Sequence, residues 1–250
     1  MSTRRRWPWI VALLIVAVLA VVAWFAGEFI ARSIVEKTIR DQIVTNLQLP
    51  ADQDIDVDVA GPVLPQLIIG SLADVTIAAD DVSFDAISGD VHARLLDVPI
   101  RGGDWSSAEA TVTLDQPQLQ TLLASVDGFP ADTITLDPPD VGVAMDLQLF
   151  GLTVPVGIDL TPRAENGDLV LTPTTLRVSG AEISAAALAE QFGAIASTVI
   201  RDWDVCVAQY FPAAVTLTDV TVQKDAVVAG FEIDSAILRD AAAQENGTCA

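Results

Sequence analysis

A long uncharged segment behind a cluster of arginines constrains this chain more than any other feature. Arg4, Arg5 and Arg6 precede residues 7–27, which carry no formal charge and consist mainly of Val, Leu, Ile and Ala. A helix of this length rises by about 30 Å, which matches the hydrocarbon core of a bilayer. Tryptophans near both ends of the segment suit the two membrane interfaces. The segment therefore predicts a membrane-spanning helix.

The arginine cluster also predicts the orientation of that helix, because positive charge stays on the cytoplasmic side. We expect a single-pass membrane protein with a cytoplasmic N-terminus and an extracytoplasmic domain over residues 28–250. The alternative is a cleaved signal peptide, for which residues 21–23 offer small side chains at a suitable spacing. The length of the apolar run, which continues to Phe25, favours the anchor. Both interpretations export the remainder of the chain.

The exported part is strongly acidic. It contains all 34 acidic residues and all but three of the 13 basic ones, a net charge of about −24. Nucleic acid is excluded as a partner, because phosphate contacts need a basic surface. Electrostatic docking on anionic lipid heads is disfavoured for the same reason. The charge is typical of a surface that keeps a domain soluble.

Two cysteines, Cys206 and Cys249, are the only ones in the chain. Outside the cytoplasm such a pair is more often bonded than free, so we predict a disulfide that holds the C-terminus. Two cysteines and a single histidine are too few soft ligands for a structural zinc site. We expect neither a metal nor a cofactor.

Short runs of Val, Ile, Leu and Thr, separated by Gly, Pro and Asp, dominate the chain from Asp54 to Pro173. Many of them alternate apolar and polar residues, as 110–114 does, which is typical of half-buried antiparallel strands. Strands are also expected at 214–222 and 226–233. The fold class is therefore α+β: a curved, mostly antiparallel sheet wrapped with amphipathic helices, treated as one domain.

Three segments have helical periodicity. Residues 28–47 lack Gly and Pro and continue the membrane helix outward, with an apolar stripe formed by Val35, Ile39, Ile43 and Leu47. Residues 116–126 begin after Asp115, a suitable N-cap, and form a second stripe with Leu119, Leu122, Leu123 and Val126. Residues 184–201 form a third with Leu188, Phe192, Ile195 and Val199.

No arrangement of residues typical of an enzyme is found, and we assign no catalytic residue. The nucleophile elbow, phosphate-binding loops and the zinc-protease motif are all missing. His92, the only histidine, lies in an alternating strand pattern that points it toward solvent. Asp54, Asp56 and Asp58 resemble the start of a calcium loop, but Val59 and Pro65 stand where that loop needs Gly and Glu. Alternation instead puts the three carboxylates on one strand face.

One longer motif follows the predicted strand at 55–59. Residues 61–66 read Gly-Pro-Val-Leu-Pro-Gln, and Gly70 and Asp74-Val75 follow them. Near the C-terminus the chain carries Cys206, Tyr210-Phe211-Pro212 and Gly247-Thr248-Cys249. This arrangement resembles the actinobacterial LmeA-like phospholipid-binding family. The resemblance implies a tubular lipid-binding fold whose sheet and helices enclose an elongated apolar groove. It also implies binding of phospholipids, phosphatidylinositol-type lipids included, and a role in envelope lipoglycan biosynthesis.

The expected lipid-binding residues follow from the resemblance and from the two helix stripes. They are Leu64, Leu67, Ile68, Leu119, Leu122, Leu123, Val126, Leu188, Phe192, Ile195 and Val199. Each buried methylene of a lipid tail gains about 0.8 kcal/mol, so aliphatic side chains are sufficient to hold it. Two rival functions stay open. A structural envelope protein would have a solid core and bind a protein partner, and a hydrolase of envelope lipids or glycans would need a nucleophile that the sequence does not offer.

Overall fold

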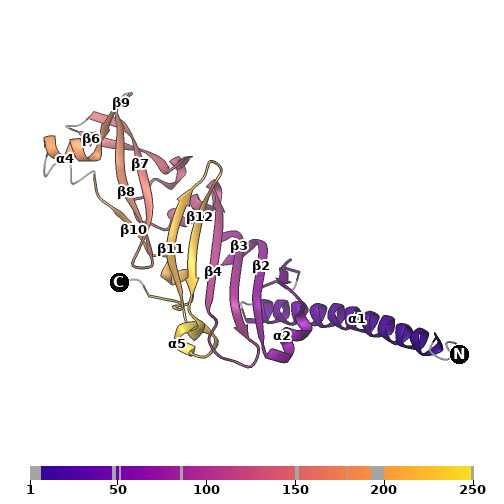
Figure 1. Ribbon diagram of the computed structural model, residues 1–250. Coiled ribbons are helices and arrows are strands. Elements are labelled where there is room, and N and C mark those ends of the chain that lie inside the picture. The colour runs from indigo at the N-terminus through magenta and orange to yellow at the C-terminus, as the bar shows by residue number, and fades with distance from the viewer. Residues whose placement is uncertain are drawn as a thin grey trace.

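The computed structural model describes residues 7–46, 49–50, 52–84, 87–149, 152–178, 180–192 and 200–248. It is an elongated molecule with a long N-terminal helix that projects from one end (Figure 1). Two antiparallel sheets follow one another away from that helix. The α+β class and the antiparallel pairing are as predicted, but the strands form two sheets where one continuous sheet was expected.

The described strands form two six-stranded sheets. In spatial order, the first sheet contains β1 (Asp56–Val59), β2 (Ser71–Phe84), β3 (Ile87–Pro99), β4 (Ser107–Asp115), β12 (Ala226–Ile233) and β11 (Val215–Val222). The second contains β10 (Trp203–Val205), β8 (Asp168–Val178), β7 (Leu152–Glu165), β6 (Asp140–Leu149) and β5 (Thr135–Asp137), with β9 (Ala181–Ser184) paired to β8.

The division into two sheets has a cause in the chain order. After β4 the chain leaves the first sheet through α3 (Gln116–Leu123) and the 3-10 turn η1 (Ala131–Thr133), and it returns only with β11 and β12. The first sheet therefore unites early and late strands, and the middle of the chain builds the second. Register shifts in β2–β3, β7–β8 and β11–β12 mark bulges, which increase the twist of both sheets.

The first helix is long, and the other described helices are short. α1 (Trp7–Asn46) is one continuous helix, as predicted, and it is the one described helix that is long and apolar enough to cross a membrane. The others are α2 (Val63–Ile69), α4 (Ala185–Phe192) and α5 (Ala241–Gln244), with 3-10 turns η3 (Ala208–Tyr210) and η4 (Ser235–Leu238).

Two apolar cores stabilise the domain. The smaller core joins α1 to the first sheet: Val35, Ile39 and Ile43 of the predicted stripe pack against Ile55 and Val57. The larger core lies between the two sheets and under α3. The residues of α1 from 9 to 26 are exposed, so the domain buries only the part of the helix that follows the uncharged segment.

The structure confirms two smaller expectations about surface residues. Asp54, Asp56 and Asp58 are exposed while Ile55 and Val57 are buried, so the carboxylates lie on the solvent side of the strand. His92 on β3 is exposed as well.

The C-terminal segment lies against the region that follows β10. Gly247 donates its N–H to the carbonyl oxygen of Phe211 at 3.0 Å, and Asn246 donates through its side chain to the carbonyl oxygen of Gln209 at 2.8 Å. These contacts hold residues 246–247 beside η3. Cys249 lies outside the described residues, so the bond between the two cysteines stays a prediction.

Candidate lipid-binding site

An apolar cavity lies where the two sheets meet. Its volume is about 50 Å³, and the described residues that line it include no charged side chain. Leu169 of β8 lines the cavity from the second sheet, while β3, β4, β11 and β12 of the first sheet provide most of the wall. About 10–15 Å³ of such volume holds one water-sized sphere, so the cavity has room for a few methylene groups and not for a whole acyl chain.

Helix α3 covers one side of the cavity, and a capping box fixes where it begins. The Asp115 side chain accepts the N–H of Gln118 at 2.8 Å, and the Gln118 side chain accepts the N–H of Asp115 at 2.8 Å, which completes a capping box. The Gln116 side chain donates to the carbonyl oxygen of Ile134 at 2.7 Å. These contacts fix the helix so that Leu119 and Leu122 face the cavity.

The floor of the cavity is the inner face of the first sheet. Val227, Ala229 and Phe231 alternate along β12, which places all three on one face of the strand. Val112 and Leu114 do the same on β4, whose register sets Val112 opposite Ala229. This floor consists of branched aliphatic side chains and Phe231, with Ala229 as a small residue among them.

The segment around η3 also lines the cavity. Phe211 packs against Phe231 with ring centroids 4.8 Å apart, and Tyr210 also lines the cavity. The Tyr210 hydroxyl donates to the Ser125 hydroxyl oxygen at 3.4 Å. A weak polar contact therefore links the η3 segment to the end of α3, at the margin of an otherwise apolar site.

One charged group is buried in the second sheet. Asp159 on β7 is 6% exposed, and its carboxylate accepts a hydrogen bond from Arg177 of β8 at 2.6 Å. Burial raises the pKa of Asp159 above its ordinary value. Asp159 is not among the residues that line the cavity, so the chemistry available there is apolar contact.

The first predicted helix stripe lies at this site. Leu119 and Leu122 line the cavity, Leu123 is completely buried beside them, and Val126 is half-buried against the same core. The second stripe is described only in part. Leu188 packs against the same core, the side chain of Phe192 lies outside the described part, and Ile195 and Val199 lie outside the described residues. The described members of both stripes thus share one core, and an open elongated groove between them stays a prediction.

The three predicted residues of the 61–75 motif lie elsewhere. Leu64 and Leu67 are half-buried beside α1, and Ile68 is 82% exposed. None of them lines the cavity, and Figure 1 places α2 at the end of the molecule from which α1 projects. The reason is that the segment forms a helix docked on α1, which the sequence analysis did not identify.

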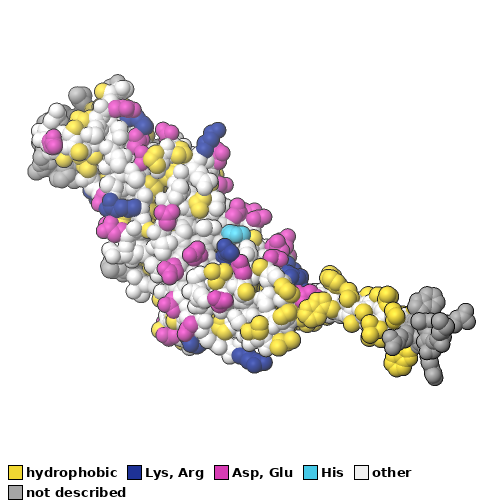
Figure 2. All heavy atoms as spheres, viewed as in Figure 1, with side chains coloured by type: hydrophobic (Ala, Val, Ile, Leu, Met, Phe, Trp, Pro, Cys, Tyr) yellow, Lys and Arg dark blue, Asp and Glu magenta, His cyan; other side chains and the backbone are white. Residues whose placement is uncertain are grey.

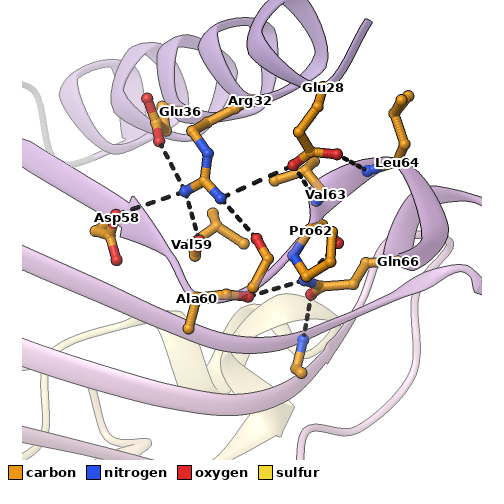
Figure 3. A network of polar contacts seen from close by, with 12 residues as sticks. Glu28, Arg32, Glu36, Asp58, Val59, Ala60, Pro62, Val63, Leu64 and Gln66 are labelled. Carbon is orange, nitrogen blue, oxygen red and sulfur yellow. Dashed lines mark hydrogen bonds and ion pairs between the residues drawn. The ribbon is translucent and has the colours of Figure 1, made fainter. Parts of the chain in front are cut away.

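Polar contacts explain the motif in structural terms (Figure 3). Glu28 accepts the backbone N–H groups of Val63 and Leu64, the latter at 3.0 Å. Gln66 donates to the carbonyl oxygens of Ala60 and Pro62 and accepts the N–H of Ala73 at 2.8 Å. Gly70 ends α2 in the left-handed conformation, with φ of 92°.

Arg32 joins the same network from α1. It donates to the carbonyl oxygens of Val59 and Gly61, both at 2.6 Å, and lies 3.6–3.8 Å from the carboxylates of Glu28, Glu36 and Asp58. The network fastens β1 and α2 to α1. The motif therefore serves to dock the domain on the helix.

The sequence analysis missed the strand residues and aromatic residues that complete the cavity wall. Val112, Ala229 and Phe231 belonged to predicted strands, and their alternation indicated which residues face inward. No pattern in the sequence pairs β4 with β12, because these strands are more than 100 residues apart along the chain. The Tyr210-Phe211 pair was noted only as part of the motif.

The fold and the site define an α+β protein with an apolar cavity between two sheets. A model of the LmeA-like phospholipid-binding family matches residues 26–232, and the chain belongs to that family. No curated protein and no solved structure matches the chain significantly. The family membership supports phospholipid binding, and the apolar cavity is the described feature with the matching chemistry.

Proposed function

We propose that the protein is a membrane-anchored, extracytoplasmic phospholipid-binding protein that holds or carries lipid in the cell envelope. The match of the phospholipid-binding family to residues 26–232 carries this proposal. The apolar lining of the cavity between the sheets supports it, as does the exposed apolar surface of α1. The specific ligand that we propose to test first is a phosphatidylinositol-type lipid, and the specific process is lipoglycan biosynthesis.

Binding of an acyl chain requires the cavity walls to separate. We expect α3 to be the wall that moves, because it is a helix of eight residues and its link to η3 is a single long hydrogen bond, from Tyr210 to Ser125 at 3.4 Å. The gain from each buried methylene is about 0.8 kcal/mol, so even half of an 18-carbon chain offsets the loss of several side-chain contacts. The headgroup would stay at the margin, in water.

Native mass spectrometry of residues 28–250, secreted from a bacterial host, tests the proposal. Deleting residues 1–27 removes little packing, since residues 9–26 are exposed. We expect a bound phospholipid in a defined ratio to protein. Protein that carries no lipid, and takes none up from vesicles, would contradict the proposal.

A substitution in the cavity floor locates the binding site. Ala229→Leu should fill the space above β12 and reduce bound lipid several-fold. Its control is Ala144→Leu on β6, where the side chain is exposed. Equal lipid content in the two variants would place the lipid outside this cavity.

The orientation can be tested independently. A reporter fused after Ala250 should be active only outside the cytoplasm, because the arginine cluster precedes the uncharged segment. Activity in the cytoplasm would reverse the proposed orientation.

A second candidate function is an anchored scaffold of the envelope. The observation that favours it is the small volume of the cavity, about 50 Å³. A scaffold would tolerate Ala229→Leu only poorly, because overpacking a solid core costs about 1–3 kcal/mol. Lipid-free protein together with strong destabilisation by Ala229→Leu would favour the scaffold.

A further inference from the structure

The end of α2 exposes two large apolar side chains beside the membrane-proximal part of α1. Ile68 is 82% exposed and Ile69 is 78% exposed, although both belong to a regular helix whose start is firmly held. Ile100, 45% exposed, lies next to them, since its N–H donates to the carbonyl oxygen of Gly70 at 3.0 Å. We call Ile68, Ile69 and Ile100 the apolar tip.

The polar network fixes the position of the apolar tip relative to α1. Glu28 holds the first N–H groups of α2, and a Cβ added at Gly27 would lie 3.4 Å from Leu64. Since α2 has seven residues and rises about 1.5 Å per residue, Ile68 and Ile69 lie within roughly 10 Å of this junction. The junction is the point at which the uncharged segment of α1 ends.

The outer face of α1 stays apolar beyond that junction. Glu28 and Arg32 turn toward the domain and are engaged in the network, while Phe29, Ile30 and Ile34 are exposed. Figure 2 shows hydrophobic side chains on the helix and on the end of the domain from which it emerges. The apolar surface of a spanning helix thus continues to the level of α2.

We propose that the apolar tip inserts into the interface of the bilayer that α1 spans. This inference rests on the membrane anchoring in the proposed function. The bilayer is the occupant that the contacts favour, because the apolar tip is fastened to the spanning helix at the membrane surface. The interfacial layer outside the hydrocarbon core is several ångströms deep on each side, which is within reach of the tip. Insertion makes the anchor a two-point attachment that sets the tilt of the domain.

The driving force is apolar burial and not charge. Arg101, exposed beside Ile100, is suited to a lipid phosphate, but Asp97 and Asp104 are also exposed and lie within four residues of it. We therefore expect insertion into uncharged phosphatidylcholine membranes as well as anionic ones.

The test uses the full chain in phosphatidylcholine nanodiscs. A polarity-sensitive fluorophore is attached at position 69 through Ile69→Cys, and at position 238 through Leu238→Cys as a control, since Leu238 is 51% exposed in η4. The unsubstituted chain gives the background from the native cysteines. We expect a blue-shifted emission at position 69 that nitroxide-labelled lipids quench several-fold more than at position 238. A further Ile68→Ser change should reduce that quenching.

Two results would overturn the inference. One is emission at position 69 that is typical of water and is not quenched by the labelled lipids. The other is a blue shift without lipid quenching, which would assign the tip to a second copy or a protein partner. Lipid content measured by native mass spectrometry separates this inference from the proposed lipid-binding function. A chain that carries lipid but keeps its apolar tip in water refutes only the insertion of the tip. A lipid-free chain whose tip is quenched refutes only the lipid-binding function.

Discussion

The carboxylate of Glu28 accepts the backbone N–H of Leu64 at 3.0 Å, across 36 positions of sequence, and it accepts the N–H of Val63 as well. A charged acceptor at a helix start satisfies donors that have no partner within the helix. Here the acceptor comes from a different helix. The contact therefore caps α2 and also docks it on α1, in line with the remaining polar contacts of Arg32 and Gln66 (Figure 3).

Glu28→Gln should loosen α2 without unfolding the domain. The amide keeps one acceptor oxygen but loses the charge and the second acceptor. We expect faster hydrogen exchange of the amides at Val63 and Leu64 in the variant. Glu36→Gln is the control, because Glu36 lies near Arg32 at 3.7 Å and makes no contact with α2 in the described network. Equal protection of α2 in the two variants would contradict the capping role.

The buried leucines of α3 should differ in their sensitivity to truncation. Leu123 is completely buried in solid packing, while Leu122 borders the cavity. Leu→Ala substitutions in cores cost about 2–5 kcal/mol, and the cost depends on the space left behind. We expect Leu123→Ala near the upper end of this range and Leu122→Ala near the lower end, measured by denaturant unfolding of residues 28–250. A larger loss for Leu122→Ala would indicate that α3 is packed as tightly on the cavity side as elsewhere.

The Asp74–Arg94 pair gives a pH-dependent contribution to stability. Asp74 is part of the family motif, and Arg94 on β3 donates to its carboxylate at 2.7 Å. This hydrogen bond holds the pKa of Asp74 below its ordinary value. Stabilisation is therefore complete above the unfolded pKa of about 3.9 and disappears as the pH falls through the lower folded value. Because the pair is partly exposed and screened by solvent, we expect this contribution to be small.

Asp74→Asn tests that pair. Its unfolding free energy should lie slightly below that of the unsubstituted chain at pH 7, and the difference should shrink in acid. A difference that does not change between pH 7 and pH 3 would show that the loss arises from packing and not from the ion pair.

The predicted disulfide between the two cysteines can be tested by thiol alkylation. If Cys206 and Cys249 are joined, alkylation of unfolded, unreduced protein should modify neither. Cys206→Ser should destabilise the domain by up to roughly 4 kcal/mol, the loop-closure value for a segment of this length. Modification of both cysteines before reduction would refute the bond.

Much of the fold could be predicted from local sequence patterns. The N-cap residue Asp115 and the apolar stripe that follows it identified α3, and alternation identified the buried face at Ile55 and Val57. The continuation of the membrane helix beyond Gly27 followed from the lack of Gly and Pro over residues 28–47. These features depend on neighbouring residues, so a single sequence contains them.

The pairing of distant strands and the docking of α2 could not be predicted in the same way. Residues 63–69 follow one proline, contain another, and include an apolar run that is too short for periodicity to distinguish a helix from a strand. Contacts between residues far apart in sequence, such as that between Glu28 and Leu64, decide where that helix lies. The cavity likewise depends on the pairing of β4 with β12, which are more than 100 residues apart along the chain, and on the aromatic contact between Phe211 and Phe231.

The central claim is that an acyl chain lies between α3 and the inner face of the first sheet. A phospholipid with a photoreactive diazirine near the middle of one acyl chain tests it directly. After loading onto residues 28–250, irradiation and peptide mass spectrometry, we expect crosslinks to concentrate on residues 112–122 and 220–231, which include the cavity-lining residues of α3 and of strands β4, β11 and β12. Crosslinks confined to the exposed end of α2, or spread over the surface at similar yield, would contradict binding between the sheets.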